Sequence, residues 1–365
     1  MCWEGTDRMA RLEQLHEKTF IKQTLSRYAT TAMAERFDDC ITIDLSKILG
    51  VPGLPYLVYS MDHPSKISRP LPPGMEWRFY GRWIAGCTCG DVLAMGARPH
   101  GFSADLSAPI DTEVATIEQI YAGLSDVLAQ YGAEFEGGNF DINTQLGVVG
   151  FCWGIVERNA IIRRVGAQNG DYVAVTSAPG IGWSSYLLNK RGLFTRLDKY
   201  HQRMLEEYNL MPTAPARAII EAARLPGAIT SGMDLTDGPI EFFYNIAERN
   251  GLGVRVEERL IPLPEILLAA AAALDVPAPL LALDPGYDTP RIHGYTIARE
   301  RWNDVKSVFD ANSMPLYQLG EVTSTSGVMW VPISGPPREL PRFWADQFRE
   351  KQLLERWLDL VDELR

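Results

Sequence analysis

Segments with a helical pattern alternate irregularly with segments that resemble strands, and this alternation predicts a mixed α/β fold. The clearest helix runs from Val114 to Tyr131, where apolar residues recur every three or four positions and form one stripe. Asp111 or Thr112 can cap its start, and Gly132 can end it. Further helices are expected over residues 7–34, 82–95, 215–223, 239–250 and 341–365, and strands over 40–44, 55–62, 146–156 and 172–176.

The chain has 365 residues, enough for two domains that each have an apolar core. The strand and helix patterns place the boundary between them near residues 158–166. We therefore expect an N-terminal helical extension over residues 1–34, a first domain over 35–160, a second α/β domain over 161–335, and a C-terminal helix over 336–365.

Composition and charge exclude several classes of protein. The net charge is −11, and no basic stripe of the kind that binds nucleic acid is found. The longest apolar run, near Leu267 to Leu274, is too short to cross a membrane and is bounded by Pro264 and Asp275. The start of the chain lacks the basic and apolar regions of a secretion signal. A cytoplasmic protein is expected.

The cysteines predict neither a disulfide framework nor a metal site. There are five, at scattered positions, which is an odd number. Cys87 and Cys89 could be half of a metal site, but no second pair or nearby histidine completes it. We interpret both as small packing residues on a helix.

Acidic residues at the ends of the expected elements are the best candidates for chemistry. The sequence has no P-loop, no dinucleotide-binding fingerprint after a strand, and no histidines at metal-ligand spacing. Aspartates next to glycines on separate loops could hold Mg²⁺, which prefers hard oxygen ligands, while phosphates approach the backbone. Aspartate beside glycine is also common in ordinary turns, so a single such position carries little weight. The candidates are Asp38, Asp39, Asp62, Asp91, Asn139, Asp141, Asp234 and Asp237.

Taken together and in order, six segments resemble the motifs of thiamine-monophosphate kinases. The segments are Asp38-Asp39-Cys40-Ile41, Ser60-Met61-Asp62, 90–99 (GDVLAMGARP), Gly137-Gly138-Asn139, 164–171 (RVGAQNGD) and 233–238 (MDLTDG). The chain is thus similar, over about residues 38–327, to the superfamily of thiamine-monophosphate kinase and aminoimidazole ribonucleotide synthetase.

The resemblance implies a two-domain α/β fold, and a homodimer in which the N-terminal sheets form a shared barrel. It also implies ATP and several Mg²⁺ ions in a cleft lined by aspartates. The residues implied in catalysis are Asp91 and Asp237. Those implied in cofactor binding are Asp38, Asp39, Asp62, Gly137, Gly138, Asn139 and Arg164. The implied metal ligands are Asp38, Asp62, Asp91, Asp141 and Asp237.

Departures from the family pattern leave the acceptor open. Asn139 stands where the family has an aspartate, and Gly90 replaces the serine before Asp91. The leading hypothesis is an ATP-dependent phosphotransferase acting on a small molecule. An amide-activating synthetase of the aminoimidazole ribonucleotide type is an alternative, and Gly137-Gly138-Asn139 favours it slightly. A catalytically inactive nucleotide-binding protein is the third.

Overall fold

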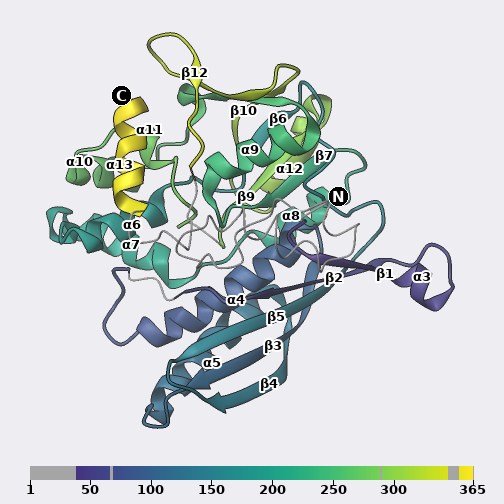
Figure 1. Ribbon diagram of the computed structural model, residues 1–365, viewed down its shortest axis with the longest axis vertical. Helices are drawn as coiled ribbons and strands as arrows, with labels where there is room; N and C mark the ends of the chain where they lie inside the picture. The colour runs from purple at the N-terminus through teal and green to yellow at the C-terminus, as the bar shows by residue number, and fades with distance from the viewer. Residues whose placement is uncertain (1–37, 66–68, 288–289, 344–352, 365) are drawn as a thin grey trace, which may run out of the picture.

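The computed structural model describes residues 38–65, 69–287, 290–343 and 353–364. The expected helix over 7–34 lies outside this part of the chain. The described residues form two β-sheets with helices packed against them, as Figure 1 shows. This confirms the mixed α/β fold. The shared barrel of a dimer remains a prediction.

The first sheet has the order β1-β2-β5-β3-β4. All neighbouring strands are antiparallel except β3 and β4, which are parallel. One face of this sheet is covered by two helices, α4 and α5 (Figure 1). The strands and helices are β1 Ile41–Asp44, α3 Leu45–Leu49, β2 Tyr56–Asp62, α4 Glu76–Ala94, β3 Arg98–Ala108, α5 Val114–Tyr131, β4 Glu134–Ile142 and β5 Gly147–Val156.

The second sheet has the order β12-β11-β8-β10-β6-β9-β7, with β7 at one edge. Its strands are β6 Tyr172–Val175, β7 Ile229–Asp234, β8 Gly253–Glu257, β9 His293–Ile297, β10 Tyr317–Thr323, β11 Gly327–Val331 and β12 Arg338–Glu339. Its helices are α6 Ile181–Lys190, α7 Lys199–Leu210, α8 Ala216–Ala223, α9 Gly238–Asn250, α10 Glu265–Leu274, α11 Ala278–Leu281, α12 Trp302–Ala311 and α13 Leu353–Leu364.

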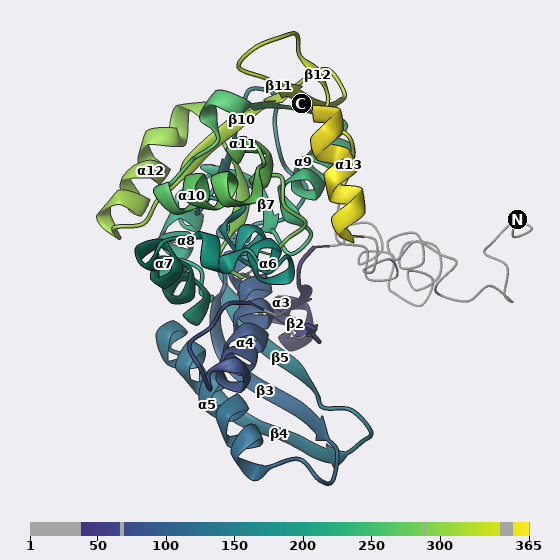
Figure 2. The ribbon, with the colours of Figure 1, turned by 90° about the vertical axis from the view of Figure 1, so that its left-hand side faces the viewer.

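Helix α4 lies between the two sheets and is buried on almost every side (Figure 2). Its apolar side chains share one core with strands of both sheets, including Phe102 of β3 and Ile297 of β9. It crosses α5 very closely: a Cβ atom on Gly81 would lie 2.0 Å from the Ile120 carbonyl oxygen. Because α4 contacts both sheets, a side chain near its end can meet residues from either one.

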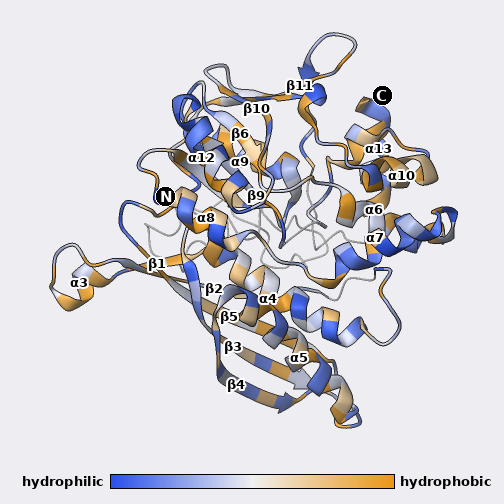
Figure 3. Cartoon of the chain, turned by 180° about the vertical axis from the view of Figure 1, so that it is seen from behind, coloured by the Kyte–Doolittle hydropathy of each residue, from blue (hydrophilic) through white to orange (hydrophobic). Residues whose placement is uncertain are grey.

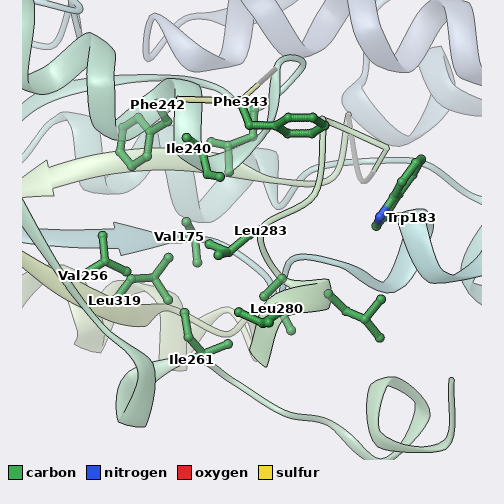
Figure 4. Close-up of a cluster of buried hydrophobic side chains, with 14 of the residues drawn as sticks. Val175, Trp183, Ile240, Phe242, Val256, Ile261, Leu280, Leu283, Leu319 and Phe343 are labelled. Atoms are coloured by element: carbon green, nitrogen blue, oxygen red, sulfur yellow. The ribbon is translucent and has the colours of Figure 1, made fainter. Parts of the chain in front are cut away.

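A second core lies on the other side of the second sheet, and Figure 4 shows part of it. Val175, Val256 and Leu319 point there from the strands, and Ile240 and Phe242 point there from α9. Burial of such side chains contributes about 1.5–3 kcal/mol each. This packing fixes the start of α9 next to the end of β7.

Several expected elements are confirmed and others need correction. The helix over 114–131 has the predicted bounds, and α9 begins one residue before the expected Pro239. Helix α4 begins at Glu76, six residues earlier than expected. Cys87 and Cys89 are buried on this helix, as predicted. No described helix is long and apolar enough to span a bilayer.

The C-terminal helix was expected from Pro341, and that start is wrong. Residues 341–343 have no helical structure, and the described helix begins at Leu353. Arg342 pairs instead with the buried Glu241 of α9, with nitrogen–oxygen distances of 2.8 and 2.9 Å. Within α13, the side chains of Trp357, Val361 and Leu364 are buried, so the predicted apolar face is confirmed for these three residues.

The uncovered face of the first sheet leads to a prediction about assembly. Alternate residues of β5 are buried under the helices, whereas Phe151 and Trp153 on the opposite face are only half-buried. Figure 3 shows hydrophobic and hydrophilic residues alternating along β3 and β4. Met61, which is paired with Phe151 and shares its face, is 66% exposed. An apolar sheet face and a free edge strand are features that a partner normally covers.

We therefore expect a homodimer formed through this sheet. Light scattering should give twice the chain mass of 40.7 kDa at micromolar concentration. Met61→Glu should shift the mass toward one chain, because a charge would enter the apolar interface. Ile333→Glu, on an equally exposed residue of the second domain, is the control. A wild-type mass of one chain would contradict the prediction.

Candidate active site

Three carboxylates from three separate elements meet where the two sheets adjoin. Asp39 precedes β1, Asp91 lies near the end of α4, and Asp234 is the last residue of β7. Each offers an oxygen atom, and these atoms all lie within 4.8 Å of one another. We call Asp39, Asp91 and Asp234 the acidic cluster.

Asp91 is held by strand β2. The Ser60 hydroxyl donates a hydrogen bond to Oδ2 of Asp91. Ser60 and Asp62 are two residues apart on β2 and therefore point to the same face of the sheet, toward α4. The Asp62 carboxyl thus lies on the same side as Asp91, next to the acidic cluster.

Asp39 is held by the segment that follows the first sheet. The guanidinium of Arg164 donates to Oδ1 of Asp39 and forms an ion pair with it. The carbonyl oxygens of Arg163 and Arg164 accept hydrogen bonds from Gly232 N and the Ser231 hydroxyl at 2.9 and 3.0 Å. These bonds fasten the segment to the edge strand β7, and so bring Asp39 to Asp234.

Asp234 and Asp237 lie in the short connection from β7 to α9. The Thr236 hydroxyl donates to Asp234 Oδ1 at 3.3 Å. Asp237 is at the start of α9, but its side chain makes no capping hydrogen bond to the helix. Gly238 has φ of 87°, and a Cβ atom there would lie 2.0 Å from the Asp284 carbonyl oxygen. A glycine is therefore required for this connection to pass so close to the loop after α11.

The electrostatics of the cluster favour a bound cation. Burial raises the pKa of Asp91 well above its ordinary value, and the charges of Asp234, Asp62 and Asp39 raise it further. Burial also raises the pKa values of Asp234 and Asp39, with Arg164 opposing the rise at both. Carboxylates packed this closely repel one another unless a proton or a cation lies between them.

Two oxygens of the cluster are available as ligands. Among the described residues, Oδ2 of Asp39 and Oδ2 of Asp234 are buried and accept no hydrogen bond. Buried polar atoms are normally satisfied, so this pair indicates a missing positive group. The donors are all carboxylate oxygens from separate elements, which fits Mg²⁺ or a similar hard cation.

Of the five predicted metal ligands, the structure places only Asp91 in the acidic cluster. Asp62 borders it, and Asp237 is close enough to raise the pKa of Asp234. Asp38 turns to the Arg163 guanidinium at 2.6 Å and to the Arg164 backbone N–H at 3.1 Å. Its charge is thereby compensated, so Asp38 is better assigned to fixing the 163–164 segment.

Residues Gly137, Gly138, Asn139 and Asp141 lie on the exposed edge strand β4. Gly138 is in the same row of the sheet as Asp62, but two strands lie between them. At the normal strand spacing the separation is about 14 Å. These predicted residues therefore do not join the acidic cluster within one chain. The Asn139 amide donates to the Asp105 carboxylate at 3.1 Å. A carboxylate therefore lies next to Asn139, although residue 139 itself is not an aspartate.

Two members of the site were not among the predicted site residues. The sequence marks Asp234 as a carboxylate at the end of an element and Ser60 as part of a motif, but its patterns assign neither residue to the site. Asp234 is the last residue of its strand, as Asp62 is of β2, and this position at a strand end could have identified Asp234 as a candidate ligand. The hydrogen bond of Ser60 depends on how α4 packs against β2, which local sequence does not reveal.

A buried histidine near the cluster predicts a pH dependence of stability. Nε2 of His293 donates to the Gly90 carbonyl oxygen at 2.9 Å, and burial lowers the pKa of His293 from its ordinary 6.5 to about 4. The folded state therefore keeps this ring neutral while the unfolded chain takes up a proton below pH 6.5. Its contribution is complete above pH 6.5 and is lost as the pH falls toward 4, by about 3 kcal/mol in total.

The test is to compare denaturant unfolding between pH 7 and 4 for wild type and His293→Gln. Glutamine can still donate to the Gly90 carbonyl but does not titrate. The variant should lose less stability than wild type across this range. Equal losses in the two proteins would contradict a neutral buried His293.

Comparisons with known proteins agree with this architecture. Residues 37–156 match the family described as AIR synthase related protein, N-terminal domain. The thiamine-monophosphate kinase of Synechococcus elongatus is 27% identical over 230 residues, which cover 60% of this chain and 68% of that protein.

Solved structures show the same fold over nearly the whole chain. AaThiL complexed with AMPPCP and TMP aligns with a TM-score of 0.72 at 21% identity, covering 91% of this chain and 99% of that one. HypE of E. coli aligns with a TM-score of 0.65 at 17% identity, covering 87% and 94%. The chain therefore shares the fold of these structures, which in this chain places two α/β units around helix α4.

Within this class of fold, the family match, the kinase relatives and the motif series agree. The chain is similar to the superfamily of thiamine-monophosphate kinase and aminoimidazole ribonucleotide synthetase, and its residues 37–156 match that family's N-terminal domain.

Proposed function

We propose that the chain is an ATP- and Mg²⁺-dependent phosphotransferase that acts on a small-molecule acceptor. The observation that supports this most strongly is the acidic cluster, with three carboxylates within 4.8 Å and two unpartnered oxygens. The kinase relatives and the structural likeness to AaThiL, solved with AMPPCP and TMP, support the same class of reaction. A cytoplasmic location remains part of this proposal.

Asp39, Asp91 and Asp234 would hold the cation, with Asp62 beside them. Bound Mg²⁺ supplies positive charge that offsets the charge of the phosphate oxygens. The protein's own part is positioning. Arg164 fixes Asp39, and Ser60 fixes Asp91. Ser60 lies on strand β2, and the segment with Arg164 is hydrogen-bonded to strand β7, which favours a preorganised site.

Asp237 is the residue we assign to the acceptor. It lies at the start of α9, beside the acidic cluster but outside its 4.8 Å limit. Its charge reaches the cluster, where it raises the pKa of Asp234, so we assign its carboxylate to orienting an acceptor hydroxyl or a phosphate-bound cation. Nucleotide binding by the β4 residues stays a prediction. These residues are Gly137, Gly138, Asn139 and Asp141.

Product analysis tests the proposed reaction. The protein is incubated with Mg²⁺, labelled ATP and a pool of small metabolites. A phosphotransferase should give ADP and a stable labelled phosphorylated product. ADP with free phosphate and a new C–N bond would instead indicate the amide-activating reaction. No ATP consumption, with ATP still bound, would indicate an inactive nucleotide-binding protein.

A further inference from the structure

Tyr295 is a fully buried tyrosine beside the acidic cluster, and its hydroxyl has no assigned role. Among the described residues, that hydroxyl makes no hydrogen bond. A buried phenol normally finds a partner, because leaving it unsatisfied costs about 1–3 kcal/mol. Burial raises the pKa of Tyr295 well above its ordinary value, and Asp39 and Asp234 raise it further. The hydroxyl is therefore a neutral donor close to two carboxylates.

The strand register shows how the ring reaches the cluster. Tyr295 on β9 is paired with Gly232 on β7, and His293 is paired with Asp234. Gly232 and Asp234 are two residues apart, so they share a sheet face with Tyr295 and His293. A Cβ atom on Gly232 would lie 2.3 Å from Cδ1 of the Tyr295 ring. The Tyr295 ring therefore lies across β7 at Gly232, which has no side chain to block it.

Asp39 lies on the side of β7 that the Tyr295 ring approaches. Strand β7 is at the edge of its sheet, and the Arg163–Arg164 segment lies along its outer side through the Gly232 N–H to Arg163 bond. Arg164 in turn holds Oδ1 of Asp39. Among the described residues, the side-chain atoms left without partners around Asp39 and Asp234 are the two Oδ2 atoms, the Tyr295 hydroxyl, Arg164 Nε and His293 Nδ1. The Tyr295 hydroxyl is thus one of two unsatisfied donors in the same buried region as the two carboxylate oxygens.

We propose that Tyr295 is a positioning residue for the cation site, whose hydroxyl donates to a carboxylate of Asp39 or Asp234 when a divalent cation is bound. The inference rests on the proposed function, since it needs a cation at the acidic cluster. Carboxylates that bind metals generally accept hydrogen bonds from neighbouring groups, and loss of such a group typically lowers metal affinity 10–100-fold. Gly232 contributes to this arrangement, because its lack of a side chain leaves space for the Tyr295 ring.

The experiment measures Mn²⁺ binding by calorimetry, without nucleotide, and melting temperature with and without Mn²⁺. Tyr295→Phe keeps the ring and removes only the hydroxyl. Because that hydroxyl is unsatisfied in the cation-free protein, its loss should leave the cation-free melting temperature unchanged or higher. Mn²⁺ affinity should fall about tenfold or more. Tyr121→Phe on α5, far from the cluster, should change neither quantity.

Three outcomes are distinguishable. Tight Mn²⁺ binding by wild type and weak binding by Tyr295→Phe supports the inference. Equal affinities, or a lower cation-free melting temperature with unchanged affinity, would show that Tyr295 is only a packing residue. No Mn²⁺ binding by wild type would instead overturn the cation site itself. Gly232→Ala is a second variant, because displacing the ring should also lower Mn²⁺ affinity.

Discussion

Asp91→Asn is expected to lower ATP turnover by more than about 100-fold, while the melting temperature of the cation-free protein stays the same or rises. Loss of a group that only orients a metal ligand costs 10–100-fold, so loss of a ligand itself should cost more. Asparagine fits the same space and can still accept the hydrogen bond from Ser60. Removing one charge also relieves the repulsion that raises the pKa of Asp91.

The measurement pairs steady-state turnover with thermal unfolding. Asp310→Asn, an exposed aspartate on α12, is the control and should behave as wild type. Normal turnover in Asp91→Asn would contradict the proposed site. A large fall in melting temperature would instead indicate a structural role for the carboxylate at the end of α4.

Asp237→Asn is expected to lower turnover by about 100-fold or more, a loss comparable to that caused by removing one preorganised transition-state contact. The change keeps the shape of the side chain and removes its charge. Stability should not change, because asparagine keeps the shape of the side chain and caps a helix equally well. Mn²⁺ affinity should fall less than in Asp91→Asn, since Asp237 lies outside the acidic cluster.

Turnover of Asp237→Asn is measured at saturating ATP over a range of acceptor concentrations. Asp234→Asn is the matched variant from the same connection, and it should lose Mn²⁺ affinity as Asp91→Asn does. If Asp237→Asn turned over normally, Asp237 would be only the residue that begins α9. The acceptor site would then have to be sought elsewhere.

Much of the fold could be predicted because its elements carry strong local patterns. The stripe from Val114 to Tyr131 requires a helix of the observed length, and the capping glycine after it ends that helix. Helix α4 was predicted too short because its start carries no local signal. Met75 stands at the N-cap and makes no side-chain capping bond, so the sequence does not mark where the helix begins.

The site was predicted less completely than the fold. Motif order brings Asp39, Asp91 and the 233–238 segment into consideration, but it does not show which carboxylates meet. Asp38 and Asp39 are adjacent in sequence, yet one turns to Arg163 and the other to the acidic cluster. That choice depends on the path of residues 163–164 along β7, which is a tertiary contact. Similarly, Gly137–Asn139 are placed far from Asp62 by the strand order of the first sheet.

Cation-dependent ATP binding is the measurement that tests the central claim most directly. Calorimetric titration of ATP into the full chain should show binding in Mg²⁺ and none in excess chelator, because the acidic cluster repels phosphate unless a cation lies between them. Asp91→Asn should bind ATP weakly even in Mg²⁺. Undiminished ATP binding by wild type in chelator would contradict a cation-mediated nucleotide site at Asp39, Asp91 and Asp234.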